Sequence, residues 1–140
     1  VYLHGDLIYG DTMLREFLRA TVSSTASIDL LTAFGPVDDE AMKVRVEASG
    51  RLIESRKGIP VNDAQGEWTG IAAVHRPVIV FAQMERHLML AGLSDYDTAA
   101  FTSLVLSGEE VRCLPSAGEP WKEIDTIADW ESAQLEFETA

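Results

Sequence analysis

The first side chains able to do chemistry are carboxylates near the two ends of the chain. Asp6 follows a short apolar run at the start, and Glu123 and Asp125 lie near the other end, separated by Ile124. Residues two apart on a strand point to the same face, so Glu123 and Asp125 would present their carboxylates together. Mg²⁺ is typically bound by one or two carboxylates and takes its other ligands from water and substrate phosphates. These residues are therefore candidates for phosphoryl or nucleotidyl transfer. From spacing, the alternative is a turn at Asp6 and a solvated strand residue at Glu123.

A basic pair, Arg56 and Lys57, follows a predicted β-hairpin. The hairpin consists of an alternating segment, 42–46, a turn at Ser49-Gly50, and a returning segment, 51–55. This arrangement places Lys57 in a loop at the far end of the hairpin, before Pro60.

Strand-like and helix-like segments alternate along most of the chain. Strands are predicted at 1–4, 27–34, 42–46, 51–55, 68–74, 111–114 and 121–125. This order predicts an α/β domain with a largely parallel sheet, interrupted by one antiparallel hairpin. In such a sheet ligands gather beyond the carboxyl ends of the strands, so Asp6 and the 123–125 segment could share one site.

Four helices are expected between and after these strands. Their start and stop signals are a cap at Asp11, Pro77 with Gly92, Ser94 with Asp97 and a stop at Gly108, and a Thr126–Asp129 capping box.

The composition describes one domain, residues 1–140, with 46% hydrophobic residues and a net charge of −12. The eleven Lys and Arg residues are scattered, which argues against nucleic-acid binding. The single cysteine, Cys113, excludes a disulfide framework and is expected to be a buried thiol in a cytoplasmic, reducing setting. No apolar run has the length of a membrane span. Because the chain opens on Val1 inside a strand-like run, we expect the sequence to begin partway through a gene product.

Four stretches, in order and at fitting separations, resemble the nucleotidyltransferase family that includes the sugar-phosphate, phosphocholine and aminoalkylphosphonate enzymes. They are Val1-Tyr2-Leu3-His4-Gly5-Asp6, Ala41-Met42-Lys43-Val44 with the Gly50 hairpin and Ser55-Arg56-Lys57, Gly66-Glu67-Trp68-Thr69-Gly70-Ile71, and Trp121-Lys122-Glu123-Ile124-Asp125-Thr126. Together they cover nearly the full chain. The resemblance implies a partial nucleotide-diphospho-sugar transferase (Rossmann-like) fold, with helices on both faces of the sheet.

The resemblance also implies roles for single residues. Asp6, Glu123 and Asp125 would hold a catalytic Mg²⁺, and Lys57 would reach the phosphate of the acceptor. Asp6, Lys57 and Asp125 are therefore the expected catalytic residues.

The ending Glu-Ile-Asp-Thr, residues 123–126, is similar to the choline-phosphate and aminoethylphosphonate cytidylyltransferases, which favours CTP. For an acceptor with a quaternary ammonium, Trp68 or Trp121 could supply a ring face, although core or rim packing is the commoner role of such rings. Glu67 could pair with an amine or be a solvated turn residue. All three are retained as candidate substrate-binding residues.

One departure from the family concerns nucleotide binding. Family members begin with a strand and a Gly-rich loop that holds the triphosphate, and this chain has no such loop. We expect the C-terminal half of a nucleotidyltransferase, with that loop encoded upstream or supplied by a complementing segment. Its function would be activation of a small phosphorylated alcohol with release of pyrophosphate. The alternative is a non-catalytic truncated homologue that binds a ligand or self-associates as a homodimer.

Overall fold

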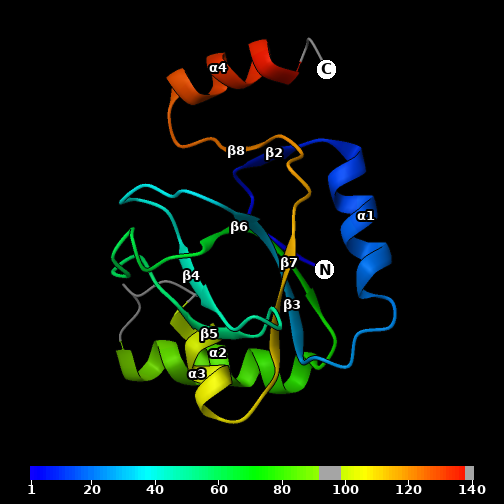
Figure 1. Ribbon diagram of the computed structural model, residues 1–140, viewed down its shortest axis with the longest axis vertical. Coiled ribbons are helices and arrows are strands. Elements are labelled where there is room, and N and C mark those ends of the chain that lie inside the picture. Colours follow the sequence, from blue (N-terminus) through cyan, green and yellow to red (C-terminus); the bar gives the residue numbers. More distant parts are fainter. Residues whose placement is uncertain (92–98, 138–140) are drawn as a thin grey trace.

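The computed structural model describes residues 1–91 and 99–137, which form a central sheet with helices on both faces (Figure 1). Its elements are β1 (Tyr2–Leu3), β2 (Leu7–Tyr9), α1 (Asp11–Thr21), β3 (Ile28–Phe34), β4 (Lys43–Val46), β5 (Leu52–Ser55), β6 (Gly66–Val74), α2 (Pro77–Ala91), α3 (Ala99–Leu106), β7 (Val111–Pro115), β8 (Trp121–Glu123) and α4 (Ile127–Phe137).

The central sheet is mixed, in the order β5-β4-β6-β3-β7, and β1 pairs with the long strand β6. Only β3 and β7 run parallel among the described strands; the other neighbours are antiparallel. Strand β6 is antiparallel to both β3 and β4, and β5 is antiparallel to β4, so β3, β4 and β7 share one direction and β5 and β6 the other. No helix intervenes between β3 and β6, whereas α2 and α3 precede β7. The predicted α/β class and the antiparallel hairpin are confirmed, and parallel pairing is confined to β3 and β7.

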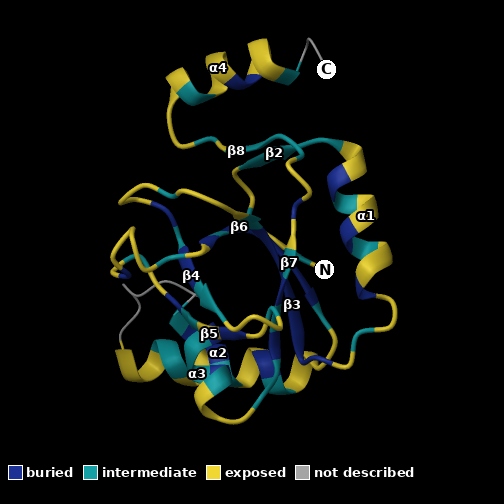
Figure 2. Cartoon of the chain, in the orientation of Figure 1, coloured by how far each residue is buried: buried dark blue, intermediate teal, exposed yellow. Residues whose placement is uncertain are grey.

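Both faces of the sheet are covered by helices. On one face α2 and α3 enclose a core in which Trp68 meets Phe101 edge to face, with ring centroids 5.1 Å apart. On the other face α1 places Met13 and Phe17, four residues apart and therefore on one side of the helix, against Leu31 and Ile71. Burial is concentrated in β3 and β6, while α4 is largely exposed (Figure 2).

Helix ends agree with the predicted signals in part. The Thr126–Asp129 capping box is confirmed, because the Asp129 carboxylate accepts from the Thr126 amide at 2.8 Å and the Asp129 amide donates to the Thr126 hydroxyl. The cap predicted at Asp11 is wrong: Gly10 is the N-cap, without a side-chain hydrogen bond, and Asp11 lies in the first turn, where it complements the helix dipole. The predicted Gly92, Ser94 and Asp97 signals lie outside the described residues.

Strand β6 contains a glycine that brings the start of the chain against it. Gly70 has φ +80°, and a Cβ there would lie 2.8 Å from Leu7 Cδ1 and 3.2 Å from His4 Cβ. The His4 amide also donates to the Gly70 carbonyl at 3.0 Å. A larger residue at Gly70 would therefore strain the backbone and push away the segment that carries Asp6.

Strands β2 and β8 form a separate two-stranded ribbon beyond the central sheet, between it and α4 (Figure 1). Helix α4 buries Ala133 completely but leaves Ile127 and Leu135 more than 70% exposed. In the described ranges, no helix combines the length and apolar character needed to cross a membrane. Cys113 is buried, as predicted.

Candidate active site

Pairing of β2 with β8 brings the two predicted acidic segments together. Leu7 lies opposite Glu123, and the amide of Ile124 donates to the carbonyl of Asp6 at 2.8 Å. Asp6 immediately precedes β2 and Asp125 lies two residues beyond the end of β8. The two segments are thus adjacent through direct backbone pairing in a small antiparallel ribbon, and not as neighbouring ends of parallel strands.

The charges of nearby acidic residues act on the carboxyl group of Glu123. Desolvation raises the pKa of Glu123, and the negative charges of Asp6 and Asp125 raise it further, while His4 and Lys57 oppose the shift. Asp6, Glu123 and Asp125 are exposed residues. Carboxylates close enough to repel one another favour a proton or a cation between them.

Glu67, at the start of β6, adjoins the same group of charges. Burial raises the pKa of Glu67, with added repulsion from Asp38 and Glu123, and Lys43 lowers it. We refer to Asp6, Glu67, Glu123 and Asp125 as the carboxylate cluster. The electrostatic effect of Glu123 on Glu67 therefore supports the prediction that Glu67 belongs to the candidate site.

The carboxylate cluster fits Mg²⁺ in its donor chemistry, since carboxylate oxygens are the hard ligands this ion prefers. Among residues 1–91 and 99–137, no group of three or more His, Cys, Asp or Glu side chains has the geometry to hold a metal ion. A complete protein cage is therefore not formed. Mg²⁺ commonly binds through one or two carboxylates and fills its octahedron with water and substrate phosphate, and Asp6, Glu123 and Asp125 can supply that share.

Lys57 lies in the turn that follows β5, as the hairpin predicted. Its ammonium is 3.4 Å from a carboxylate oxygen of Glu40, and its side chain is 36% exposed. Its charge acts on Glu123. An exposed ammonium next to a group of carboxylates can contact a phosphate that a cation holds there.

The two tryptophans proposed as ring faces differ in their surroundings. Trp68 is 1% exposed, its indole nitrogen donates to the carbonyl of Ile71 at 2.9 Å, and its ring packs against Tyr2 and Phe101. It is a core residue that cannot offer a face to a ligand, which corrects its assignment to substrate binding. Trp121 is half-buried on β8 and lines a hollow, so its ring remains a candidate.

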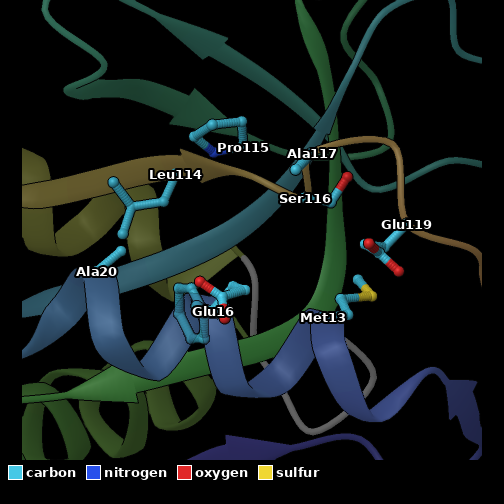
Figure 3. A pocket seen from close by; sticks show the side chains of 9 residues that line it. Met13, Glu16, Ala20, Leu114, Pro115, Ser116, Ala117 and Glu119 are labelled. Atoms are coloured by element: carbon cyan, nitrogen blue, oxygen red, sulfur yellow. The ribbon is translucent and has the colours of Figure 1, made fainter.

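A cavity of about 230 Å³ lies between α1 and the segment after β7, apart from the predicted site residues (Figure 3). It is mainly apolar, with Met13, Phe17 and Leu114 in its lining and Glu16 and Glu119 as its charged members. None of the residues predicted to do chemistry lines it. The candidate active site is therefore defined by charges on an open surface and not by this enclosed space.

Sequence reasoning missed several residues around the carboxylate cluster. Asp38 and Lys43 act on Glu67, and Trp130, 51% exposed, lines a hollow with Asp125. The exposure of Trp130 is not apparent from the sequence, because a helical pattern of apolar residues does not show what the helix packs against. Lys43 gave no sequence signal, because a lysine fits the alternating pattern of residues 42–46.

Comparison with known proteins gives similarity in structure only. No family model and no curated protein sequence matches the chain. The solved structures similar to it include an inositol-1-phosphate CTP transferase from T. maritima, with 22% identity and a TM-score of 0.69 over 96% of this chain. A Bacillus anthracis protein named as a glucose-1-phosphate thymidylyltransferase, bound to sucrose, has 16% identity and a TM-score of 0.71 over 95%. A nucleoside-diphosphate-sugar pyrophosphorylase from Vibrio cholerae has 11% identity and a TM-score of 0.61 over 91%.

The matches cover nearly all of this chain but only about half of each solved structure. The chain spans 52% of the length of each of the three solved structures. All three are named for transfer of a nucleotidyl group or for the reverse, pyrophosphorolytic direction. The expected fold is thereby confirmed, and the chain has the fold of about half of each of these three structures.

Proposed function

We propose that the chain is the acceptor-side part of a Mg²⁺-dependent nucleotidyltransferase, with CTP as the favoured nucleotide. The acceptor would be a small phosphorylated alcohol, such as phosphocholine or a sugar phosphate, or an aminoalkylphosphonate. The observation that carries the proposal is the β2–β8 pairing, which puts Asp6 beside Glu123 and Asp125. The buried thiol of Cys113 fits a reducing, cytoplasmic compartment.

In the proposed reaction the acidic and basic side chains have different roles. An oxygen of the acceptor phosphate forms a bond to the α-phosphorus of the nucleoside triphosphate, the bond to the β-phosphate breaks, and pyrophosphate leaves. Mg²⁺, when held by Asp6, Glu123 or Asp125, supplies neutralisation of the charge on phosphate oxygens. Lys57 holds the acceptor phosphate in place, which lowers the entropic cost of the attack.

The nucleotide needs protein groups beyond those described above. The similar structures are about twice as long as this chain, and the T. maritima protein is named as a CTP transferase. A Gly-rich loop supplied by another segment or chain would bind the triphosphate through its backbone amides. Trp121 and Glu67 would then contact the part of the acceptor beyond its phosphate.

The test on this chain uses Mg²⁺ and phosphocholine as probes. Amide resonances of the 5–7 and 122–126 segments should shift on addition of Mg²⁺, and phosphocholine should bind more tightly with Mg²⁺ present. Asp125→Asn should weaken Mg²⁺ binding by about tenfold or more. Asp63→Asn is the matched control, because Asp63 is exposed and lies outside the carboxylate cluster.

The outcomes separate the proposal from its rivals. Equal Mg²⁺ affinity in the Asp125→Asn and Asp63→Asn variants would exclude a metal site at the carboxylate cluster. When the complete protein is assayed with CTP and phosphocholine, pyrophosphate release should disappear in Asp6→Asn and Asp125→Asn. Turnover that survives both substitutions would refute the reaction proposed here.

A self-associating module is the second candidate, favoured by one observation. Helix α4 exposes Ile127, Trp130 and Leu135, and an apolar helix face of this kind often binds another surface. Light scattering would report a dimer, which Trp130→Lys should dissociate. A stable dimer that ignores Mg²⁺ and CTP would favour the module over the enzyme.

A further inference from the structure

Lys43, the first residue of β4, is a buried ammonium held only by backbone carbonyls. Its side chain is 1% exposed, and Nζ donates to the carbonyl oxygens of Asp39 at 2.6 Å, Lys57 at 2.9 Å and Ala41 at 3.4 Å. The described part of the chain places no carboxylate in ion-pair contact with it. A desolvated charge of this kind is retained at a cost, so its three acceptors are expected to matter.

Those acceptors belong to two loops that are separate in sequence. In the 38–41 turn, a carboxylate oxygen of Asp38 accepts from the amides of Glu40 and Ala41, both at 2.9 Å. In the 56–58 turn, the Arg56 amide donates to the Lys43 carbonyl at 3.1 Å. The Lys43 amide also donates to the Ala41 carbonyl at 2.9 Å, so Lys43 bonds to both loops with its side chain and its backbone.

Both loops carry charges that act on the carboxylate cluster. Lys57, whose own carbonyl accepts from Lys43, influences Glu123, and Asp38 influences Glu67. The Lys57 ammonium also reaches across to Glu40 of the first loop, at 3.4 Å. The position of the Lys57 side chain thus depends on how the two turns are held together.

We propose that Lys43 is a positioning residue whose buried ammonium locks the 38–41 and 56–58 turns together and thereby aims Lys57 at the acceptor phosphate. This inference rests on the proposed function, in which Lys57 binds that phosphate. Lys43 itself, enclosed below the two turns, does not contact the substrate.

The ammonium is better suited to this task than a neutral side chain. It has three donors on one atom at the end of a flexible stem, which matches three converging carbonyls. A methionine of similar length would fill the space but remove the Nζ donor from the Asp39 and Lys57 carbonyls, so the turns would separate or admit water.

The experiment compares Lys43→Met, Lys57→Met and wild type in two measurements. Hydrogen exchange of the 56–59 amides reports whether the turn is held, and titration with phosphocholine in Mg²⁺ reports phosphate binding. Lys43→Met should speed exchange in this turn, keep the protection of β3 and β6, and weaken phosphocholine binding by about fivefold or more. Lys57→Met should weaken binding to a similar degree and leave the exchange unchanged.

Each result has one meaning. If Lys57→Met weakens binding and a folded Lys43→Met does not, the positioning role is overturned while the proposed function stands. If Lys57→Met leaves binding unchanged, the phosphate role of Lys57 is refuted, even where Lys43→Met loosens the turn. Should Lys43→Met fail to fold, Lys43→Gln, with two donors at the same site, decides by the same two measurements.

A change in catalysis provides an independent readout in the complete protein. Lys43→Met should raise the KM for phosphocholine and leave the KM for CTP unaltered, since Lys57 serves the acceptor alone. Equal increases in both constants would indicate general damage to the fold and would overturn the positioning role.

Discussion

Carboxylates at the two ends of strands β3 and β6 have opposite electrostatic surroundings. At one end Asp29 is completely buried, and its oxygens accept hydrogen bonds from Arg112 at 2.8 and 3.2 Å, with His75 2.9 Å away. At the other end Glu67 and Glu123 repel each other near Asp6. The buried carboxylate of Asp29 is therefore paired with basic side chains, whereas those of Glu67 and Glu123 lie near other acidic residues.

The unpaired end of β3 and β6 is the end that holds the candidate site. Carboxylates that repel one another destabilise the folded state, and such arrangements persist mainly where a ligand relieves them. Lys43, a buried cation nearby, donates to carbonyls and not to the carboxylate cluster. This difference between the ends locates the candidate site more firmly than any cavity in the molecule.

The largest expected effect is loss of the partner at the paired end. Arg112→Met would leave the buried Asp29 carboxylate with His75 as its remaining partner, so we expect a loss of about 3 kcal/mol in the free energy of unfolding. Urea denaturation monitored by tryptophan fluorescence would measure it.

The matched control for this variant is Arg19→Met. Arg19 pairs with Glu16 at 2.6 Å on the exposed surface of α1, where removal of the ion pair should cost less than about 1 kcal/mol. Similar losses in both variants would show that Asp29 does not depend on Arg112, and the contrast between the two ends would disappear.

A smaller effect of opposite sign is expected at the unpaired end. Because the pKa of Glu123 is raised in the folded protein, the folded state binds this proton more tightly than the unfolded state. Stability should therefore fall as pH rises from the ordinary glutamate pKa through the raised one. Glu123→Gln should remove this fall and stabilise the protein at neutral pH by less than about 1 kcal/mol, since exposed charges are screened.

Urea midpoints between about pH 4 and 8 would measure this change. Glu131→Gln, on the exposed surface of α4, serves as the control and should leave the pH profile unaltered. A Glu123→Gln variant less stable than wild type at neutral pH would mean that its carboxylate is paired, which the comparison denies.

The sequence predicted local features of the fold better than pairings between distant segments. The 42–55 hairpin was recognisable because alternation and the turn at Gly50, with φ +84°, are local signals. The β2–β8 ribbon has two three-residue strands from opposite ends of the chain, which give no periodic signal. The adjacency of Asp6 and Glu123 was expected from the strand ends of an α/β sheet and from the family resemblance, and the antiparallel pairing that creates it was not.

The candidate site was predictable where chemistry follows residue type, and not where burial decides. The acidic residues and Lys57 were named from their types and positions. Trp68 was misassigned because sequence does not show that β6 lies at the centre of the sheet, enclosed by Phe101 on α3. Lys43 was passed over because a lysine in an alternating strand normally faces solvent, and its three acceptors come from loops that no local pattern brings together.

The smallest effect is expected at a third place, where a carboxylate is paired but near the surface. Hydrogen bonding from Arg45, at 2.7 Å, holds the pKa of Glu54 below its ordinary value, with Arg56 adding to the effect. A lowered pKa stabilises the folded state above the ordinary glutamate pKa, and this contribution is lost as pH falls through the lowered value. Glu54→Gln should cost less than about 1 kcal/mol at neutral pH, because both arginines are substantially exposed. Its loss should shrink as pH falls below the ordinary glutamate pKa, whereas the gain in Glu123→Gln should shrink above it, as pH falls from the raised pKa to the ordinary value. If the urea midpoints of both variants moved in the same direction from wild type at neutral pH, the contrast between the paired Glu54 and the unpaired Glu123 would be refuted.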